Sequence, residues 1–598
     1  MDSTRAVKRA HRKLRGNPFF LEELTWAAVE RGSQASSQPV PDTIQAVLAT
    51  RIDRLPPADK RLLQTAAVIG PEVPIPLLHA VTALPEAALH DNLGRLQAAE
   101  FLVETPAGPG LTYIFKHVLT QEVAYQSLLR RTRQQVHQRI AQVVEAQFPT
   151  TAETQPVWVA QHYTEAGCIE PAIAYWQRAG EQALQRSANL EAVQHLTKGL
   201  ALLATLPETP ARAQQELDLL IALGPALMAT KGYATPEVEQ TYARARALCQ
   251  QVGEMPQLFP TLWGLWRFYE GQGALPTARE LGEQLYRLAQ RTAAPMHLLE
   301  AHNTLGSTLF FLGEYAAAWR HLEQGIALID PTAQRALVLS HDMVPGVACL
   351  TVAALTLWCL GFPAQAVRRC QEALALAQAL DHPQSLVRAQ HYAAFLHHRR
   401  REVPAVQAQA EALLTLATAQ GFPLFAGLAT CWQGWVLAMQ GQGEAGLAQL
   451  RQGLTALLAT GETLAWSRFL VLLAEAVGHA GQIDEGLRLL AEALTAMAER
   501  GRGESLAEAY RLQGEFLLRL ATPDATQAEA CFQQALAIAQ RQQAKSWELR
   551  AAMSLSHLWQ RQGKCAAARQ LLAPIYGWFT EGFDTLDLQE AKALLEAL

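Results

Sequence analysis

The sequence lacks the cysteine patterns of a metal-binding or disulfide-bonded protein. Its cysteines form no C-x-x-C pair and have no histidine at ligand spacing, which argues against a zinc site and a disulfide framework. The eight cysteines are scattered over positions 168, 249, 349, 359, 370, 431, 531 and 565. The first residues also lack the apolar segment of a secretory leader. We therefore expect reduced thiols and a cytoplasmic protein.

Long uncharged runs are scarce as well. The one stretch that suggests a membrane helix is Met343 to Val367, which carries no charged residue. It is interrupted by Pro345, Gly346, Gly361 and Pro363 and has the same layout as neighbouring segments that read as soluble helix pairs. We expect it to be one of these pairs and predict no membrane partner.

Charge of one sign is not concentrated anywhere. The 50 Lys and Arg residues and the 55 Asp and Glu residues give a formal net charge of −5. The cationic stretch TRAVKRAHRKLR near the N-terminus has no interleaved aromatic residues, so we interpret it as a solvated helix face and not as an arm for nucleic acid or a membrane surface. No direct nucleic-acid partner is predicted.

The common catalytic motifs are missing. The phosphate cradle G-x-x-x-x-G-K-[ST] is absent: the only Gly-Lys pair, Gly563-Lys564, is followed by Cys565 and has Leu558 where the first glycine belongs. H-E-x-x-H and G-x-S-x-G are absent too. We expect this chain not to be an enzyme and to hold no metal or cofactor by itself.

The sequence is rich in a repeated helical pattern. Hydrophobic residues make up 50% and charged residues 18% of the chain, a composition typical of packed helices. Each repeat has an apolar helix, a turn, and a second helix with a small residue five positions after the turn. Two of the repeats are LGSTLFFLGEYAAAWRHLEQGIAL (305–328) and QGWVLAMQGQGEAGLAQLRQGLTAL (433–457). The turn recurs at positions 273, 313, 361, 401, 441, 481, 521 and 563, and glycine occupies all of them except Arg401 and Ala521.

These units cannot bury an apolar face alone and must stack. The small residues mark close helix crossings, and they are Ala278, Ala318, Ala366, Gly446 and Gly486. The pattern resembles tetratricopeptide repeats with an elongated period. We predict an all-α protein in which residues 151–598 form a tetratricopeptide-like α-solenoid superhelix; an armadillo-like or other helical solenoid is the alternative.

Residues 40–150 follow another pattern. DTIQAVLATRIDRL, PPADKRLLQTAAVIG, IPLLHAV and PEAALHDNLGRLQAAEF predict helices, and FLVET and LTYIF around PAGPG predict a strand pair. This order predicts a winged-helix domain followed by linker helices. The would-be recognition helix carries Glu86, Asp91 and Glu100 against Arg95, the opposite of the sign that phosphate attraction needs. We expect no DNA binding by this domain.

RGNPFFLEEL, Arg15 to Leu24, precedes these elements, and a segment ending in FKHVLTQEVAY leads to the repeats. This order resembles the C-terminal half of the STAND signal-transduction ATPases, closest to bacterial regulators with adenylate-cyclase or LuxR-type output domains. The resemblance implies that residues 1–39 are a remnant of the ATPase lid, that Gly16 and Pro18 contact adenine, and that His117 reaches the ADP phosphate. By chemistry alone, Pro18 is a helix-start proline and His117 a helix N-terminal residue.

We therefore expect a non-enzymatic regulatory and interaction module, the sensor part of a STAND-type ATPase lacking its P-loop domain. It would bind a protein, a peptide or a small effector in the repeat groove. The alternative is an ATP/ADP-dependent switch subunit in transcription or cyclic-nucleotide signalling. That subunit would bind nucleotide only with a P-loop ATPase domain supplied in trans, or act with a cyclase partner.

Inward positions of the first helix in each repeat predict the groove. Among them Arg388, His391 and Phe395 share one helix face beside the cationic HHRRR (397–401), which favours an acidic or aromatic ligand. The alternative is that the aromatic residues belong to the core and the arginines are solvated. The predicted groove residues are Trp263, Arg267, Asn303, Phe310, Arg388, His391, Phe395, Trp435, Arg468 and Arg511.

Overall fold

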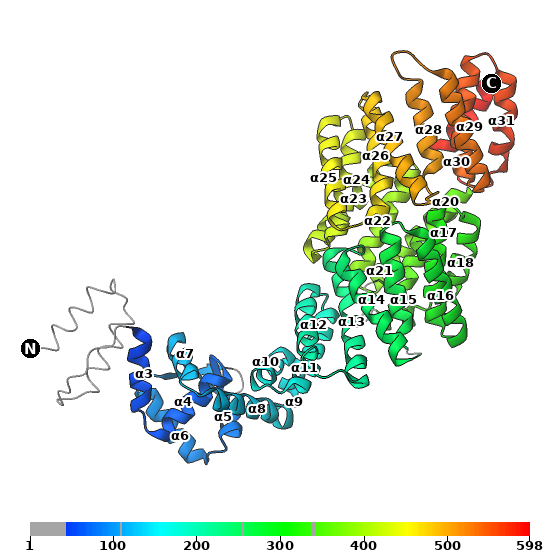
Figure 1. Ribbon diagram of the computed structural model, residues 1–598. Coiled ribbons are helices and arrows are strands. Elements are labelled where there is room, and N and C mark those ends of the chain that lie inside the picture. The colour runs from blue at the N-terminus through cyan, green and yellow to red at the C-terminus, as the bar shows by residue number, and fades with distance from the viewer. Residues whose placement is uncertain (1–42, 108–109, 254–255, 338–342) are drawn as a thin grey trace, which may run out of the picture. The chain divides into compact units, whose positions relative to one another are not determined.

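A computed structural model describes residues 43–107, 110–253, 256–337 and 343–598 (Figure 1). The chain divides into two compact units. The first ends at Ala179 and also takes in Lys198–Thr205, and the second comprises Gly180–Thr197 and Leu206–Leu598. The division falls inside α11 (Ile169–Gln185) and α12 (Asn189–Leu203), whereas the sequence predicts a boundary at residue 150.

The first unit begins with helices packed on an apolar core. Thr43 caps the first of them, since its hydroxyl accepts a hydrogen bond from the Ala46 N–H at 3.2 Å. The predicted apolar face of this helix is buried at Val47, Leu48 and Ile52. The helices are α3 (Ile44–Arg54), α4 (Pro57–Ile69), α5 (Ile75–Thr82), α6 (Glu86–Ala98), α7 (Val118–Gln126), α8 (Arg130–Gln147), α9 (Pro149–Thr154) and α10 (Pro156–Ala166).

A small antiparallel sheet accompanies these helices. The predicted strand pair is present as β2 (Leu102–Ala107) and β3 (Gly110–Phe115), with Val103 opposite Ile114. A third strand, β1 (Glu72–Pro74), pairs with the other edge of β3 and gives the order β1-β3-β2. The sequence does not predict this strand, because three residues are too short to show a period and the pairing depends on β3, some forty residues later.

The second unit is a stack of antiparallel helix pairs. Its helices are α13 (Pro210–Lys231), α14 (Pro236–Val252), α15 (Leu258–Gly271), α16 (Leu275–Thr292), α17 (Pro295–Leu312), α18 (Tyr315–Ala327), α19 (Pro331–Leu337), α20 (Pro345–Leu360), α21 (Pro363–Ala379), α22 (Pro383–Arg399), α23 (Val403–Gln420), α24 (Pro423–Met439), α25 (Gly443–Ala459), α26 (Thr463–His479), α27 (Ile483–Glu499), α28 (Leu506–Leu517), α29 (Ala525–Arg541), α30 (Lys545–Arg561), α31 (Cys565–Trp578) and α32 (Leu586–Ala597). Among the described residues, none of these helices combines the length and apolar character of a membrane span.

The predicted turns lie inside the helix pairs. Seven of the eight marker positions, all except Ala521, have a left-handed backbone with φ between 63° and 95°. At Ala521 the connection is longer, because α28 ends at Leu517 and α29 begins at Ala525. From Asp381 to Gly501 a left-handed residue recurs every 20 residues, which sets helices of about 17 residues joined by three-residue turns.

The small residues lie where the helices of a pair approach closely. Ala278, Ala318 and Ala366 are fully buried. A Cβ on Gly446 of α25 would lie 2.5 Å from the backbone nitrogen of Ala438 in α24, so the two backbones are in direct contact there. This confirms the predicted role of the small residue at Gly446, whereas Gly486 packs against the Phe516 ring of the next pair.

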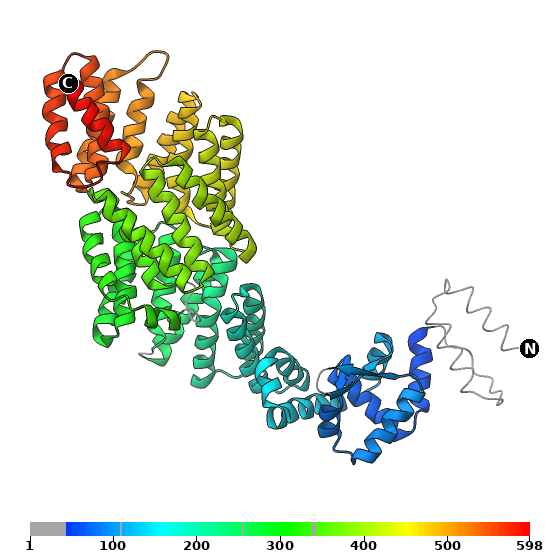
Figure 2. The same ribbon diagram turned by 180° about the vertical axis from the view of Figure 1, so that it is seen from behind.

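The stack coils until helices far apart in the sequence meet. α13 contacts α24, α15 contacts α26, and α20 contacts α30. Figures 1 and 2 show α30, in orange-red, beside α20, in green. The Thr463 hydroxyl donates to the Gln272 carbonyl at 2.6 Å, and the Gly503 N–H donates to the Phe311 carbonyl at 3.0 Å. The first helices of the pairs therefore enclose an interior.

Candidate functional site

The ten residues predicted for the groove all lie on first helices, but they do not line an open groove. Eight are buried, and Trp263 and Arg511 are half-buried. The reason is the coiling described above, because helices about 190 residues later cover the inward face. The site is consequently a closed interior whose polar groups contact one another.

The predicted trio of Arg388, His391 and Phe395 is divided between two small cavities, with the first two residues at one and Phe395 at the other. The Arg388 guanidinium lies 4.7 Å from the centre of the Tyr392 ring. His391 Nδ1 accepts a hydrogen bond from Trp432 Nε1 at 3.1 Å. Burial lowers the pKa of His391 well below its usual value, and the charges of Arg468 and Arg388 lower that pKa further, so His391 is neutral at pH 7.

The first cavity, of about 40 Å³, is lined by three guanidinium groups and two carboxylates. Arg267 Nη1 donates to Glu270 Oε2 at 2.7 Å, and its guanidinium lies 3.7 Å from the centre of the Tyr233 ring. Burial lowers the pKa of Arg267, but the charges of Glu270, Tyr233 and Glu462 outweigh burial and hold that pKa above its ordinary value. Burial raises the pKa of the Glu462 carboxyl. Counted with Arg388 and Arg468, the lining has an excess of one positive charge.

A second ionic group continues from Arg468. Glu504 Oε1 accepts a hydrogen bond from Arg502 Nη2 at 3.0 Å and lies 3.8 Å from Arg468 Nε. Burial lowers the pKa of Arg502 to about 10. In the described part of the chain, Nε and Nη1 of both arginines and Oε2 of Glu504 have no hydrogen-bond partner. Buried donors of this kind are typical of groups that bind solvent or a ligand.

The other cavity, of about 30 Å³, lies beside Arg399. Arg399 is 1% exposed, donates to the Cys359 sulfur at 2.9 Å, and has no hydrogen-bond partner at Nε and Nη2 among the described residues. Aromatic rings surround its guanidinium at 4.4 to 5.6 Å from their centres, as expected for cation–π contacts. They belong to Phe310, Trp358, Phe395 and Trp547.

The cavity volumes limit what the closed interior can hold. A cavity of this size accommodates one or two water molecules, whereas pockets for organic ligands measure about 300–1,000 Å³. The two interior cavities, of about 40 and 30 Å³, are therefore too small for an organic ligand in this conformation. Binding of a peptide requires the helix pairs to move apart.

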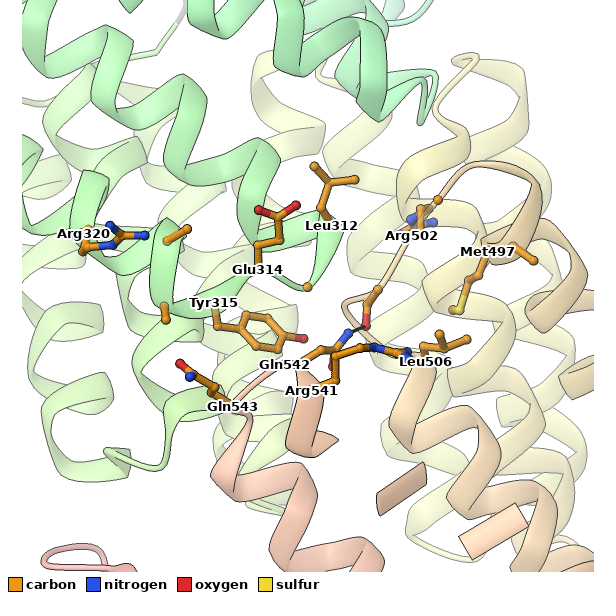
Figure 3. Close-up of a pocket in the computed structure, with 16 residues that line it drawn as sticks. Leu312, Glu314, Tyr315, Arg320, Met497, Arg502, Leu506, Arg541, Gln542 and Gln543 are labelled. Carbon is orange, nitrogen blue, oxygen red and sulfur yellow. Dashed lines mark hydrogen bonds between the residues drawn. The ribbon is translucent and has the colours of Figure 1, made fainter. Parts of the chain in front are cut away.

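A larger concavity of about 590 Å³ lies where the α17–α18 turn meets the segment before α28 and the α29–α30 turn (Figure 3). Figure 3 shows Tyr315 and Gln542 close together between these segments. The Tyr315 hydroxyl donates to the Glu504 carbonyl at 2.9 Å, and Gln542 Nε2 donates to the Gly503 carbonyl at 2.8 Å. These polar groups join segments that are distant in the sequence.

The sequence does not predict four of the polar residues of the interior. These residues lie in connections between helices and not at the inward positions of the first helices, where the groove is predicted. They are Tyr233, Glu462, Arg502 and Glu504. In the sequence, Glu462 and Arg502 share one feature: each directly follows a turn glycine, and the two positions are 40 residues apart. A charged residue after a turn is ordinary at a protein surface, so this signal does not distinguish a buried group.

His117 of the first unit is the N-cap of α7. Its Nδ1 accepts a hydrogen bond from the Leu119 N–H at 3.1 Å, and the ring is half-buried. The position matches the helix N-terminal role that chemistry alone suggests. Gly16, Pro18 and the rest of residues 1–39 lie outside the described residues.

No protein-family model matches the chain. Three of the similar solved structures are a Rap protein complexed with competence and sporulation factor (10% identity, 66% of this chain and 99% of that chain, TM-score 0.43), the quorum sensor NprR from B. thuringiensis in its apo form (12%, 62% and 99%, 0.37), and a STAND protein with a tetratricopeptide repeat sensor from Pyrococcus horikoshii (10%, 100% and 73%, 0.27). The helix pairs described above, and not these similarities, define the fold.

Among curated proteins, the chain is similar to an uncharacterized protein of Rhizobium meliloti (strain 1021), with 26% identity over 512 residues. The match covers 83% of this chain and 48% of the relative. The chain therefore spans about half the length of the curated relative that it matches.

Proposed function

We propose that the second unit is a regulatory binding module whose interior takes an acidic peptide, protein segment or small effector. The observation that carries this proposal is the buried ionic interior, in which some guanidinium nitrogens of Arg468, Arg502 and Arg399 have no hydrogen-bond partner among the described residues. Taking an ion out of water costs several kcal/mol unless it is paired, and Arg468 and Arg502 share one carboxylate, that of Glu504. We infer that this imbalance favours an anionic partner. Aromatic rings beside Arg399 and Arg468 favour an aromatic residue in the same ligand.

The proposal extends to the first unit and to the resemblance. The helix order, with the sheet order β1-β3-β2, supports a winged-helix domain that relays occupancy of the second unit. In this view the chain is the sensor part of a STAND-type regulator, with Gly16, Pro18 and His117 as its nucleotide contacts. Nucleotide binding then depends on a P-loop domain supplied in trans.

A binding experiment with labelled peptides tests the interior. Fluorescence anisotropy with six-residue peptides rich in Glu and Phe should show saturable binding, and peptides with Lys in place of Glu should not bind. Arg388→Met should weaken binding by about tenfold or more, because a charge-assisted hydrogen bond contributes roughly 1.5–3 kcal/mol.

The matched control is Arg451→Met, which removes a half-exposed arginine on a second helix. It should leave the affinity unchanged. Equal binding of the Glu-rich and Lys-rich peptides, or equal loss in both variants, would contradict the proposal.

A further inference from the structure

The cationic segment HHRRR (397–401) already has an acidic partner within the chain. Arg401 Nη1 lies 2.6 Å from Glu590 Oε2 and 3.5 Å from Asp587 Oδ1, both on α32. The sequence pattern favours an acidic ligand for this segment. In the structure, Arg401 instead pairs with carboxylates of the chain that lie 186 and 189 positions later. This contact joins the α22–α23 turn to the C-terminal helix.

Arg401 is held in a conformation that favours glycine. Its φ is 63°, in a turn where six of the eight repeats have glycine. A left-handed backbone is unfavourable for a residue with a Cβ, so glycine would relieve strain at this position. The ion pairs with α32 are the contacts that an arginine makes here and a glycine cannot.

Arg550 of α30 makes a second junction. Its Nε lies 2.8 Å from Asp587 Oδ2, and its Nη2 donates to the Arg399 carbonyl. The guanidinium lies over the rings of Trp358 and Trp547, at 5.2 and 5.3 Å from their centres. Since Trp547 also lines the cavity beside Arg399, this junction lies next to the interior.

Glu581 makes a third junction at the start of α21. Its Oε1 accepts hydrogen bonds from the N–H groups of Ala364 and Gln365 at 2.9 and 3.0 Å. A carboxylate at a helix N-terminus is favoured by the helix dipole. The following Gly582 is packed so closely that an added Cβ would lie 2.1 Å from Pro363 Cγ.

We propose that residues 545–590 form a releasable clasp that helps to hold the helix pairs closed. An acidic ligand opens the interior by competing with Asp587 and Glu590 for Arg401. The inference rests on the proposed function for the nature of the ligand. Arg401 and Glu590 are 44% and 45% exposed, so salt screens their attraction. The Arg401–Glu590 part of the clasp therefore weakens as ionic strength rises.

Hydrogen exchange on the full chain tests the clasp. Arg401→Glu should speed exchange of the Ala364 and Gln365 amides and of α32 by about five- to tenfold, because opening exposes them to solvent. Adding Glu590→Arg should restore slow exchange by reversing the pair. Arg451→Glu, which breaks the comparable Arg451–Glu485 contact away from the clasp, should leave these amides unchanged.

Small-angle X-ray scattering supplies a second measurement. If circular dichroism shows that Arg401→Glu has lost its helices, Glu590→Gln serves as a milder variant. The radius of gyration should increase in about 1 M salt for the wild type and at lower salt for Glu590→Gln. The clasp would be wrong if the clasp variants showed the same amide exchange rates and the same radius of gyration as the Arg451→Glu control.

The Glu- and Phe-rich peptide separates the two proposals. If amide exchange is faster in Arg401→Glu but no variant binds the peptide, the proposed function is wrong and the clasp is supported. Peptide binding with no change in exchange at Ala364, Gln365 or α32 would sink the clasp and keep the proposed function.

Discussion

Single residues in the second unit bury charge to an unusual degree. Arg399, Arg502 and Glu504 are each at most 2% exposed. Removing one partner of a buried ion pair typically destabilises a protein by about 3–5 kcal/mol, more than the intact pair contributes. We therefore expect variants of Arg502 or Glu504 to unfold the protein, which would obscure any effect on binding. Substitutions in the half-exposed ion pairs are better suited to binding experiments.

Two histidines form the corresponding buried polar group of the first unit. His137 Nδ1 and His162 Nδ1 lie 2.8 Å apart, and His137 Nε2 contacts the Tyr125 hydroxyl at 3.1 Å. Burial lowers the pKa of His137 to about 4 and that of His162 to about 3, and neighbouring positive charge adds to each shift. Both rings are neutral at pH 7.

These pKa values predict acid sensitivity of the first unit. An unfolded histidine takes up a proton near pH 6.5 and folded His162 does not, so its contribution to stability is present above pH 6.5 and is lost as pH falls below it. Between pH 7 and 5 the free energy of unfolding should fall by about 2 kcal/mol from His162 alone. Urea unfolding of His162→Gln should show a shallower pH dependence by that amount.

The exposed His90 of the same unit is the control. His90→Gln should leave the pH dependence unchanged. Identical pH dependence in His162→Gln and the wild type would contradict the assignment.

At the level of elements, the regular left-handed turns set the geometry of the repeats. Gly421, Gly441, Gly461, Gly481 and Gly501 occupy successive turns at 20-residue intervals. A turn of fixed length and handedness repeats the same angle between helices, and small rotations add up along the stack. The coiling of the second unit is therefore the sum of many similar junctions.

Gly481→Ala tests whether backbone conformation alone holds these turns. Gly481 has φ 81° and no atom within 4 Å of an added Cβ, so the substitution introduces strain without a clash. The free energy of unfolding should fall by about 1 kcal/mol. Gly443→Ala, at the start of α25 with an ordinary 3.4 Å contact, should be neutral or slightly stabilising in the same denaturation experiment. Equal effects of the two substitutions would show that strain is not the cause.

For the whole molecule, the nucleotide hypothesis depends on groups outside the described chain. His117 already accepts a hydrogen bond at Nδ1. A phosphate site normally adds a loop of amides, a lysine and a metal ion. Missing three or more charge-assisted hydrogen bonds weakens binding by about 5 kcal/mol or more, close to four decades in affinity.

We therefore expect this chain alone to bind ADP far more weakly than micromolar and not to hydrolyse ATP, as measured by calorimetry and phosphate release. With a P-loop domain supplied in trans, His117→Ala should weaken ADP binding more than ATP binding. Micromolar ADP affinity of the chain alone would instead support the nucleotide-switch alternative.

The sequence by itself determined the local parts of this protein: the helix pairs, seven of the eight turns, the small residues between helices, and the β2–β3 pair. Each depends on residues within one repeat or hairpin, where glycine conformation and apolar spacing act over a few positions. His117 as a helix N-terminal residue is local in the same way.

Only the tertiary structure decided that the predicted groove is closed. Arg267, Arg388 and Arg468 belong to different helix pairs, and Tyr315 reaches Glu504 across 189 positions. Whether such residues meet depends on rotations accumulated over many pairs, which no local pattern encodes. For the same reason no local pattern predicts that Asp587 and Glu590, on the last described helix, are the acidic partners of Arg401.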